Sequence, residues 1–167
     1  MKILGIDPGS RVTGWGLLES DGWEITHLDH GTLRCRPDEE LATRLVRIAD
    51  GIAELLREHR PEALAVEQVF TSKNARSALV LGHARGVILL EAARAGLVPA
   101  EYAATQVKSA VTGSGRADKR QVQAGVSTQL LLSRAPASDA ADALAIALTH
   151  AAQLRLNRHL RLQDANG

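Results

Sequence analysis

Cysteine and long apolar runs are scarce in this sequence of 167 residues. Cys35 is the only cysteine, so a disulfide within the chain is excluded, and no Cys/His spacing resembles a zinc site. Charged residues interrupt every apolar stretch well before it could span a membrane. Residues 1–10 hold too short an apolar run for a signal peptide and pass directly into a turn. We therefore expect a cytoplasmic protein in a reducing compartment.

Aromatic residues and net charge are also scarce, at 2% of the chain and +1 respectively. The core must therefore be built from Leu, Val, Ile and Ala. A net charge near zero does not indicate a partner, so local clusters of charge carry more information. The length suits one compact domain. We assign residues 1–153 to that domain and residues 154–167 to a basic C-terminal tail, whose order and DNA affinity stay open.

Hydrophobic patterning predicts three antiparallel strands followed by helices and strands in alternation. The predicted strands cover residues 3–6, 13–18, 23–33, 63–66 and 97–102. The predicted helices cover residues 38–60, 75–95, 105–112, 119–132 and 138–156. Asp38 is the expected N-cap of the first helix, with Glu39 and Glu40 in its first turn. This order predicts an α/β fold of the RNase H-like kind, with a mixed five-stranded sheet flanked by helices.

The helix expected at residues 75–95 is apolar around more of its circumference than one core requires. The apolar residues are Ala78, Leu79, Val80, Leu81, Val87, Ile88, Leu89 and Leu90. The additional apolar face suggests a second surface to be buried, such as a dimer interface.

Two predicted strands end in a carboxylate. Asp7 follows the first apolar run and precedes a Pro-Gly turn, and Glu67 follows the buried run 63–66. Sites in α/β sheets form at the carboxyl ends of strands. If the two strands are neighbours, the two carboxylates converge.

Asp139 and Asp142 lie three residues apart at the start of an apolar helix, so they share a helical face. A carboxylate there is costly to bury unless it is paired or holds a metal. Mg²⁺ prefers such hard oxygen ligands, and a pair of ions about 4 Å apart can hydrolyse a phosphodiester. Together the four acids favour a metal site.

Taken singly, three of the four acids also have an ordinary structural explanation. Asp7 can be a turn residue, Glu67 a solvated strand end, and Asp139 an acidic residue that the helix dipole favours in a first turn.

Four segments of the sequence resemble RuvC, the family of Holliday junction resolvases. They are residues 5–10 with 13–16, residues 65–70, residues 106–108, and residues 139–147. Lys73-Asn74 and residues 84–87 are also similar to the family, and the resemblance extends over residues 1–152 in order.

The resemblance implies an RNase H-like homodimer that cuts four-way DNA junctions by paired symmetrical nicks, leaving 5′-phosphate and 3′-hydroxyl ends. It implies dependence on Mg²⁺, with Mn²⁺ possible and two ions per site, and partnership with the RuvA–RuvB branch-migration complex. Asp7, Glu67, Asp139 and Asp142 match the family's catalytic carboxylates, and Asp139 stands where some members have histidine. The preferred cleavage sequence and the residues that recognise bases stay open.

Two lysines match residues on which the family relies, Lys108 and Lys119. A positive charge near the scissile phosphate would offset charge in the transition state. The alternative is a solvated surface lysine. Arg116 and Arg120 flank Lys119 and form a local basic run that favours phosphate binding.

Phe70, the only phenylalanine, follows Glu67 in a polar segment that contains Lys73. A lone aromatic residue is usually part of a core. The resemblance instead implies that Phe70 stacks on bases at the junction, where a stacked base contributes roughly 1–3 kcal/mol. Lys73 would contact DNA beside it.

Three other functions compete with junction cleavage. An actin-like ATP-using enzyme would explain the Asp-x-Gly-Ser hairpin, but it needs two copies of the fold. A related RNase H-like nuclease of the YqgF type would act on RNA. A DNA-binding module without catalysis would gain nothing from four acids placed where a phosphate docks.

Overall fold

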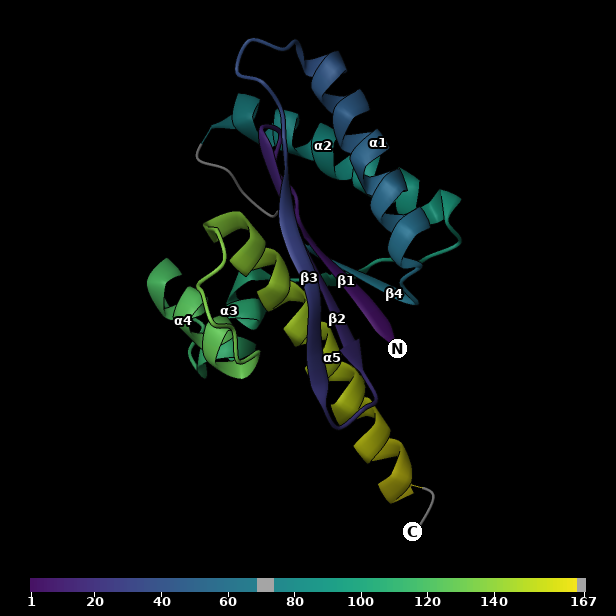
Figure 1. Ribbon diagram of the computed structural model, residues 1–167, viewed down its shortest axis with the longest axis vertical. Helices are drawn as coiled ribbons and strands as arrows, with labels where there is room; N and C mark the ends of the chain where they lie inside the picture. Colours follow the sequence, from purple (N-terminus) through teal and green to yellow (C-terminus); the bar gives the residue numbers. More distant parts are fainter. Residues whose placement is uncertain (69–73, 165–167) are drawn as a thin grey trace.

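A mixed sheet of five strands lies at the centre of the computed structural model, which describes residues 1–68 and 74–164 (Figure 1). The strands are β1 (Lys2–Asp7), β2 (Val12–Ser20), β3 (Ile25–Arg34), β4 (Ala63–Glu67) and β5 (Ala100–Tyr102). Their order is β3-β2-β1-β4-β5. The first three strands form an antiparallel meander, β4 runs parallel to β1, and β5 runs parallel to β4. The predicted sheet is confirmed.

Helices cover both faces of this sheet. They are α1 (Leu41–His59), α2 (Ala75–Arg94), α3 (Ala104–Thr112), α4 (Lys119–Gln129) and α5 (Ser138–Asp164). Buried residues of α1 and α2 form one core with the sheet, and those of α3, α4 and α5 form the other. Within the described residues, no helix is both long enough and apolar enough to cross a membrane.

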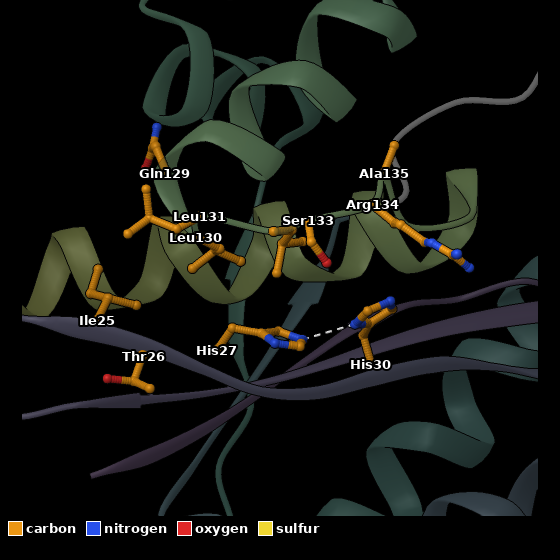
Figure 2. A pocket seen from close by; sticks show the side chains of 11 residues that line it. Ile25, Thr26, His27, His30, Gln129, Leu130, Leu131, Ser133, Arg134 and Ala135 are labelled. Atoms are coloured by element: carbon orange, nitrogen blue, oxygen red, sulfur yellow. Dashed lines mark hydrogen bonds between the residues drawn. The ribbon is translucent and has the colours of Figure 1, made fainter.

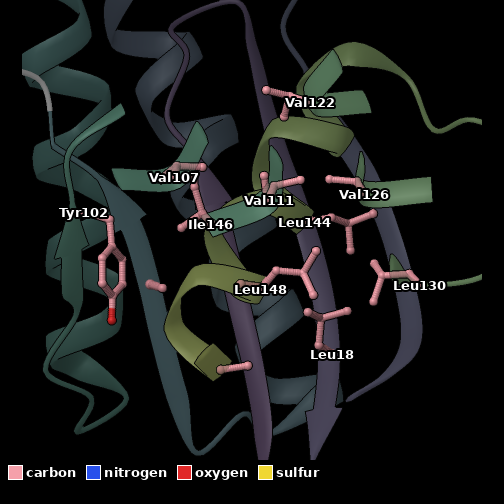
Figure 3. Close-up of a cluster of buried hydrophobic side chains, with 14 of the residues drawn as sticks. Leu18, Tyr102, Val107, Val111, Val122, Val126, Leu130, Leu144, Ile146 and Leu148 are labelled. Carbon is pink, nitrogen blue, oxygen red and sulfur yellow. The ribbon is translucent and has the colours of Figure 1, made fainter. Parts of the chain in front are cut away.

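The central strand β1 is buried on both faces. Ile3 belongs to the core under α3–α5, whereas Leu4 and Ile6 belong to the core under α1 and α2. Figure 3 shows the first of these cores, in which Leu18 of β2 lies near Leu148 of α5. Aliphatic side chains dominate both cores, as the composition predicts, because few aromatic residues are available.

The start of the first helix differs from the prediction. Helix α1 begins at Leu41 with Glu40 as its N-cap residue, and its first turn holds no acid. Asp38 lies in the preceding turn and makes a 3.6 Å ion pair with Arg36. The Glu39 side chain accepts a hydrogen bond from the Arg36 backbone N–H, which holds residues 36–39 in a turn outside the helix.

Strand β5 is shorter than predicted, and helix α5 is longer. Residues 97–99 stay outside the sheet because strand β4 pairs with residues 100–102 alone. Helix α5 continues to Asp164, and Arg155 and Arg158 each place a guanidinium 5.7 Å from the ring centroid of Trp23 in the β2–β3 hairpin. The helix therefore passes through residue 153 without a break, and a separate domain and tail on either side of that residue stay a prediction.

Candidate active site

Strand register brings Asp7 and Glu67 to one edge of the sheet. Ile6 of β1 pairs with Val66 of β4 in parallel, and each acid is the next residue of its strand. Both carboxylates therefore lie at the carboxyl ends of strands, as the sequence predicts, and the two strands are neighbours, which was the condition for the acids to converge.

Glycines let helix α5 lie directly on this part of the sheet. A Cβ atom on Gly14, the antiparallel partner of Asp7, would overlap the carbonyl oxygen of Asp139. A Cβ atom on Gly5 would overlap the Ala143 carbonyl oxygen. The close approach of the α5 backbone carries its first turns to the end of β1 that bears Asp7.

One cavity collects three of the four predicted acids. Asp7, Glu67 and Asp142 line a space of about 260 Å³ together with Lys108 and Lys119. The apolar part of its lining comes from Ala104, Val107, Val122 and Ile146.

Asp139 does not line this cavity, although it precedes Asp142 by one helical turn. It is half-buried, and its negative charge contributes to the raised pKa of Asp7. Its predicted catalytic role therefore rests on the effect of its charge on Asp7, because it does not line the cavity with the other three acids.

Burial and mutual repulsion disfavour the charged forms of the three acids. Burial, followed by the charges of Asp142, Glu67 and Asp139, raises the pKa of Asp7 to about 8. Burial also raises the pKa of Glu67, with Asp142 adding to the effect, and burial raises the pKa of Asp142. Such a site has an excess of negative charge that a bound cation would offset.

The donors fit a hard cation in their chemistry. Asp7, Glu67 and Asp142 offer only carboxylate oxygens, the ligands that Mg²⁺ and Mn²⁺ accept. Within residues 1–68 and 74–164, however, no three His, Cys, Asp or Glu side chains are grouped closely enough to hold an ion as they stand. Binding would therefore require these side chains to draw together, which their repulsion opposes until a cation is present.

Two lysines counter the acids from α3 and α4. Lys119 Nζ lies 3.7 Å from Asp142 Oδ2 and lowers the pKa of Asp142. Lys108 also lowers the pKa of both Glu67 and Asp142. Lys119 is the first residue of α4, which a capping box between Asp118 and Gln121 fixes in place.

The remaining predicted DNA contacts lie apart from the cavity. Arg116 and Arg120 are exposed and are not among its lining residues. Phe70 and Lys73 lie outside the described residues.

Two features of the site were not identified from the sequence. One is the supporting role of Gly5 and Gly14 described above. The other is Tyr102, whose backbone pairs with Glu67 and whose hydroxyl lies 2.8 Å from His150 Nδ1 of α5. This pair links β5 to α5 about two helical turns beyond Asp142. The available signal in the sequence was that the only tyrosine of the chain lies at a strand end.

Comparison with known proteins agrees with the resemblance seen in the sequence. The family model for crossover junction endodeoxyribonuclease RuvC matches residues 3–150. A RuvC from Halorhodospira halophila is 56% identical over 150 residues, which is 90% of this chain and 89% of that protein. A RuvC from Geobacter metallireducens is 48% identical over 161 residues, which is 96% of this chain and 98% of that protein.

Solved structures agree as well. Thermus thermophilus RuvC in complex with a Holliday junction substrate superposes with a TM-score of 0.88 at 38% identity, covering 94% of this chain and 96% of that chain. The yeast mitochondrial resolvase Ydc2, at a TM-score of 0.65 and 14% identity, shares the fold. These matches therefore favour the junction-cleaving family over the related nuclease of the YqgF type that acts on RNA. The chain belongs to the RuvC family of crossover junction endodeoxyribonucleases, which are metal-dependent nucleases with an RNase H-like fold.

Proposed function

We propose that the cavity lined by Asp7, Glu67 and Asp142 is where this endonuclease hydrolyses phosphodiester bonds of four-way DNA junctions. The observation that carries the proposal is the convergence of three carboxylates with raised pKa values and two lysines on one cavity. A site for binding alone would repel the phosphate that it has to accept.

Asp7, Glu67 and Asp142 would hold Mg²⁺, or Mn²⁺ in its place, with Asp139 completing the set for two ions. When bound, the ions supply an activated water and stabilise charge on the leaving oxygen. Scission on the 3′-oxygen side of the phosphate leaves a 5′-phosphate and a 3′-hydroxyl.

Basic residues and Phe70 would position the DNA. Lys119, at 3.7 Å from Asp142, would contact the scissile phosphate once a cation neutralises that carboxylate. Lys108, Arg116 and Arg120 would bind neighbouring phosphates without recognising bases. Phe70 would stack on junction bases, with Lys73 beside it.

A homodimer would supply two such sites for paired symmetrical nicks. The outer face of α2 supports it, since an open apolar groove of about 830 Å³ is lined by Leu79, Gly82, Gly86 and Leu90. Leu79 is 66% exposed and Leu90 is 49% exposed in the single chain. A second copy would cover both side chains. Family membership further supports partnership with RuvA–RuvB, and the DNA substrate supports a cytoplasmic location.

The test compares wild-type protein and Asp7→Asn on a mobile four-way junction, a linear duplex and a matched RNA, with and without Mg²⁺. We expect paired, ligatable nicks in the junction alone, only with the metal and only with wild-type protein. Asp7→Asn should still bind the junction. Cleavage by Asp7→Asn would contradict the assignment of the site, and cleavage of RNA in preference would contradict the substrate.

A Leu79→Glu variant tests the dimer separately. It should sediment as a monomer and leave unpaired nicks, whereas Val46→Glu, on an exposed position of α1, should remain dimeric. A dimeric Leu79→Glu protein would contradict this interface.

A further inference from the structure

A β-bulge turns two histidines of the edge strand β3 to the same face of the sheet. Leu17 pairs with Asp29 and Leu18 pairs with His27, so Leu28 is an extra residue between them. Residues three apart on a regular strand face opposite sides. The extra residue places both His27 and His30 on the face that α5 covers, the face of their partners Leu18 and Gly16.

The two imidazoles meet in a hydrogen bond. His27 Nε2 and His30 Nδ1 are 2.8 Å apart, and the ring centroids are 4.9 Å apart. One proton lies between these nitrogens, so a neutral pair has one N–H donor left on its two outer nitrogens. If the pair takes up one further proton, both outer nitrogens become donors and the pair carries a single positive charge.

The pair faces a cavity of about 670 Å³ between β3 and the segment that joins α4 to α5 (Figure 2). Thr26, Gln129 and Arg134 also line the cavity, although the Thr26 side chain lies on the other side of β3 from His27 in Figure 2 and the Gln129 amide donates to the carbonyl of Val111. Figure 2 shows Arg134 at the same end as His30. Among the described residues that line it there is no carboxylate, so its chemistry suits an anion.

The cavity lies close to the active site but on another part of the sheet. Asp7, Gly14 and Thr32 form one row across β1, β2 and β3, and His30 is two residues before Thr32. Two strand spacings and two residue rises place His30 roughly 12 Å from Asp7 along the sheet. No residue is shared between the lining of this cavity and that of the active site. Helix α5 lies on β2 between the two sites, because Asp139 approaches Gly14 and Leu144 approaches Gly16, so DNA that reaches both sites would pass around the start of this helix.

We propose that His27, His30 and Arg134 bind a backbone phosphate of the junction DNA on the β3 side of α5, away from the cleaved bond. That the ligand is junction DNA rests on the proposed function, whereas the suitability of the cavity for an anion does not. Phosphate contacts of this kind fix the position of the DNA strand and carry no base information.

The charges that face the histidines make the contact depend on pH. Burial and then the charge of His30 lower the pKa of His27, and Asp29 opposes them. Arg134 is the charged residue that the α4–α5 segment adds, and neither β2 nor α5 adds a charged side chain to the lining. A bound phosphate favours the protonated pair, so the contribution of the pair to DNA binding should increase from pH 8 to pH 6.

The test measures junction binding by fluorescence anisotropy in EDTA, where cleavage is absent, across salt concentration and from pH 6 to pH 8. His27→Gln with His30→Asn keeps amide groups near the bonded nitrogens but removes the proton uptake. We expect this double variant to bind several-fold more weakly than wild type at pH 6 and equally at pH 8. The active-site acids contribute the same pH dependence to both proteins.

Arg134→Gln should reduce the slope of log affinity against log salt by about 1 at every pH, as loss of one phosphate contact does. Arg57→Gln, on the exposed surface of α1, is the matched control and should leave the slope unchanged. Thermal unfolding of each variant verifies that the fold is intact.

Equal junction affinities and slopes in all variants would overturn the proposal. The proposal would also be overturned if inorganic phosphate shifted the histidine NMR signals but the variants left junction affinity unchanged. The site would then bind a free anion and not the DNA backbone. If the proposed function itself is wrong, the wild-type protein will not cleave the junction in Mg²⁺, which is a separate result from these binding measurements.

Discussion

The carbonyl oxygen of Asp139 lies directly over Gly14, in space that a Cβ atom on this glycine would occupy. Gly14 pairs with Asp7, so the contact sets the height of the first turn of α5 above the strand end that bears Asp7. Asp142 reaches the cavity from the next turn of that helix. The geometry of the acids thus depends on a residue that has no side chain.

Gly14→Ala should displace the start of α5 and separate Asp142 from Asp7. We expect cleavage to fall by about 100-fold or more, because small misplacements of catalytic groups are costly. Overpacking should also lower the free energy of unfolding by about 1–3 kcal/mol. Single-turnover cleavage and denaturant unfolding measure the two effects.

Ala53→Ser, at an exposed position of α1, is the control, since it adds one atom to a side chain that faces solvent. It should lower the free energy of unfolding by less than about 1 kcal/mol and leave cleavage unchanged. Unimpaired cleavage by Gly14→Ala would show that α5 does not need this contact.

Asp7→Asn should stabilise the metal-free protein while abolishing cleavage. The buried Asp7 carboxylate is repelled by Asp142, Glu67 and Asp139, and the amide removes this repulsion. We expect a gain of about 1–3 kcal/mol at pH 8.5. Thermal unfolding in EDTA measures it, with Asp50→Asn on the exposed surface of α1 as the neutral control. A destabilised Asp7→Asn protein would contradict this account.

The stability of the metal-free protein should carry a pH dependence that Asp7→Asn lacks. The pKa of Asp7 rises from an ordinary value of 3.8 to about 8 in the folded state, so the folded state binds the additional proton between these values. The Asp7 contribution therefore becomes less favourable as pH rises through this window, by at most about 1.4 kcal/mol per pH unit.

Unfolding midpoints of wild type and Asp7→Asn at pH 5.5, 7 and 8.5 isolate this contribution from other titrating groups. The stability advantage of Asp7→Asn should grow with pH, and saturating Mg²⁺ should reduce it by stabilising the wild type alone. A constant difference between the two proteins would mean that Asp7 titrates normally.

Lys119→Gln should slow the chemical step more than it weakens binding. Its ammonium group, 3.7 Å from Asp142, lies where charge would accumulate on the phosphate. We expect kcat to fall by about 10–100-fold with a small change in KM, and Lys119→Arg to restore part of the rate. Arg120→Gln, which removes an exposed charge outside the cavity, should instead alter salt-dependent binding. Equal effects on kcat in both variants would contradict a distinct role for Lys119.

Local sequence determined much of this protein. The apolar runs that end in Asp7 and Glu67 predicted two strands with an acid at the carboxyl end of each, because burial follows from short-range pattern. That the two strands are neighbours was left open by the sequence. The order of elements predicted the five-stranded sheet for the same reason. The start of α1 was predicted wrongly, because Glu39 hydrogen-bonds to the Arg36 backbone and keeps Asp38 in a turn outside the helix.

Tertiary structure decided the rest. Helical spacing predicted the same role for Asp139 and Asp142, but only Asp142 lines the cavity. The packing of α5 on Gly14 sets which part of the helix faces the cavity. On a regular strand His27 and His30 would lie on opposite faces, and a bulge against β2 brought them together. Each outcome depends on contacts between segments far apart in the chain, which local pattern does not encode.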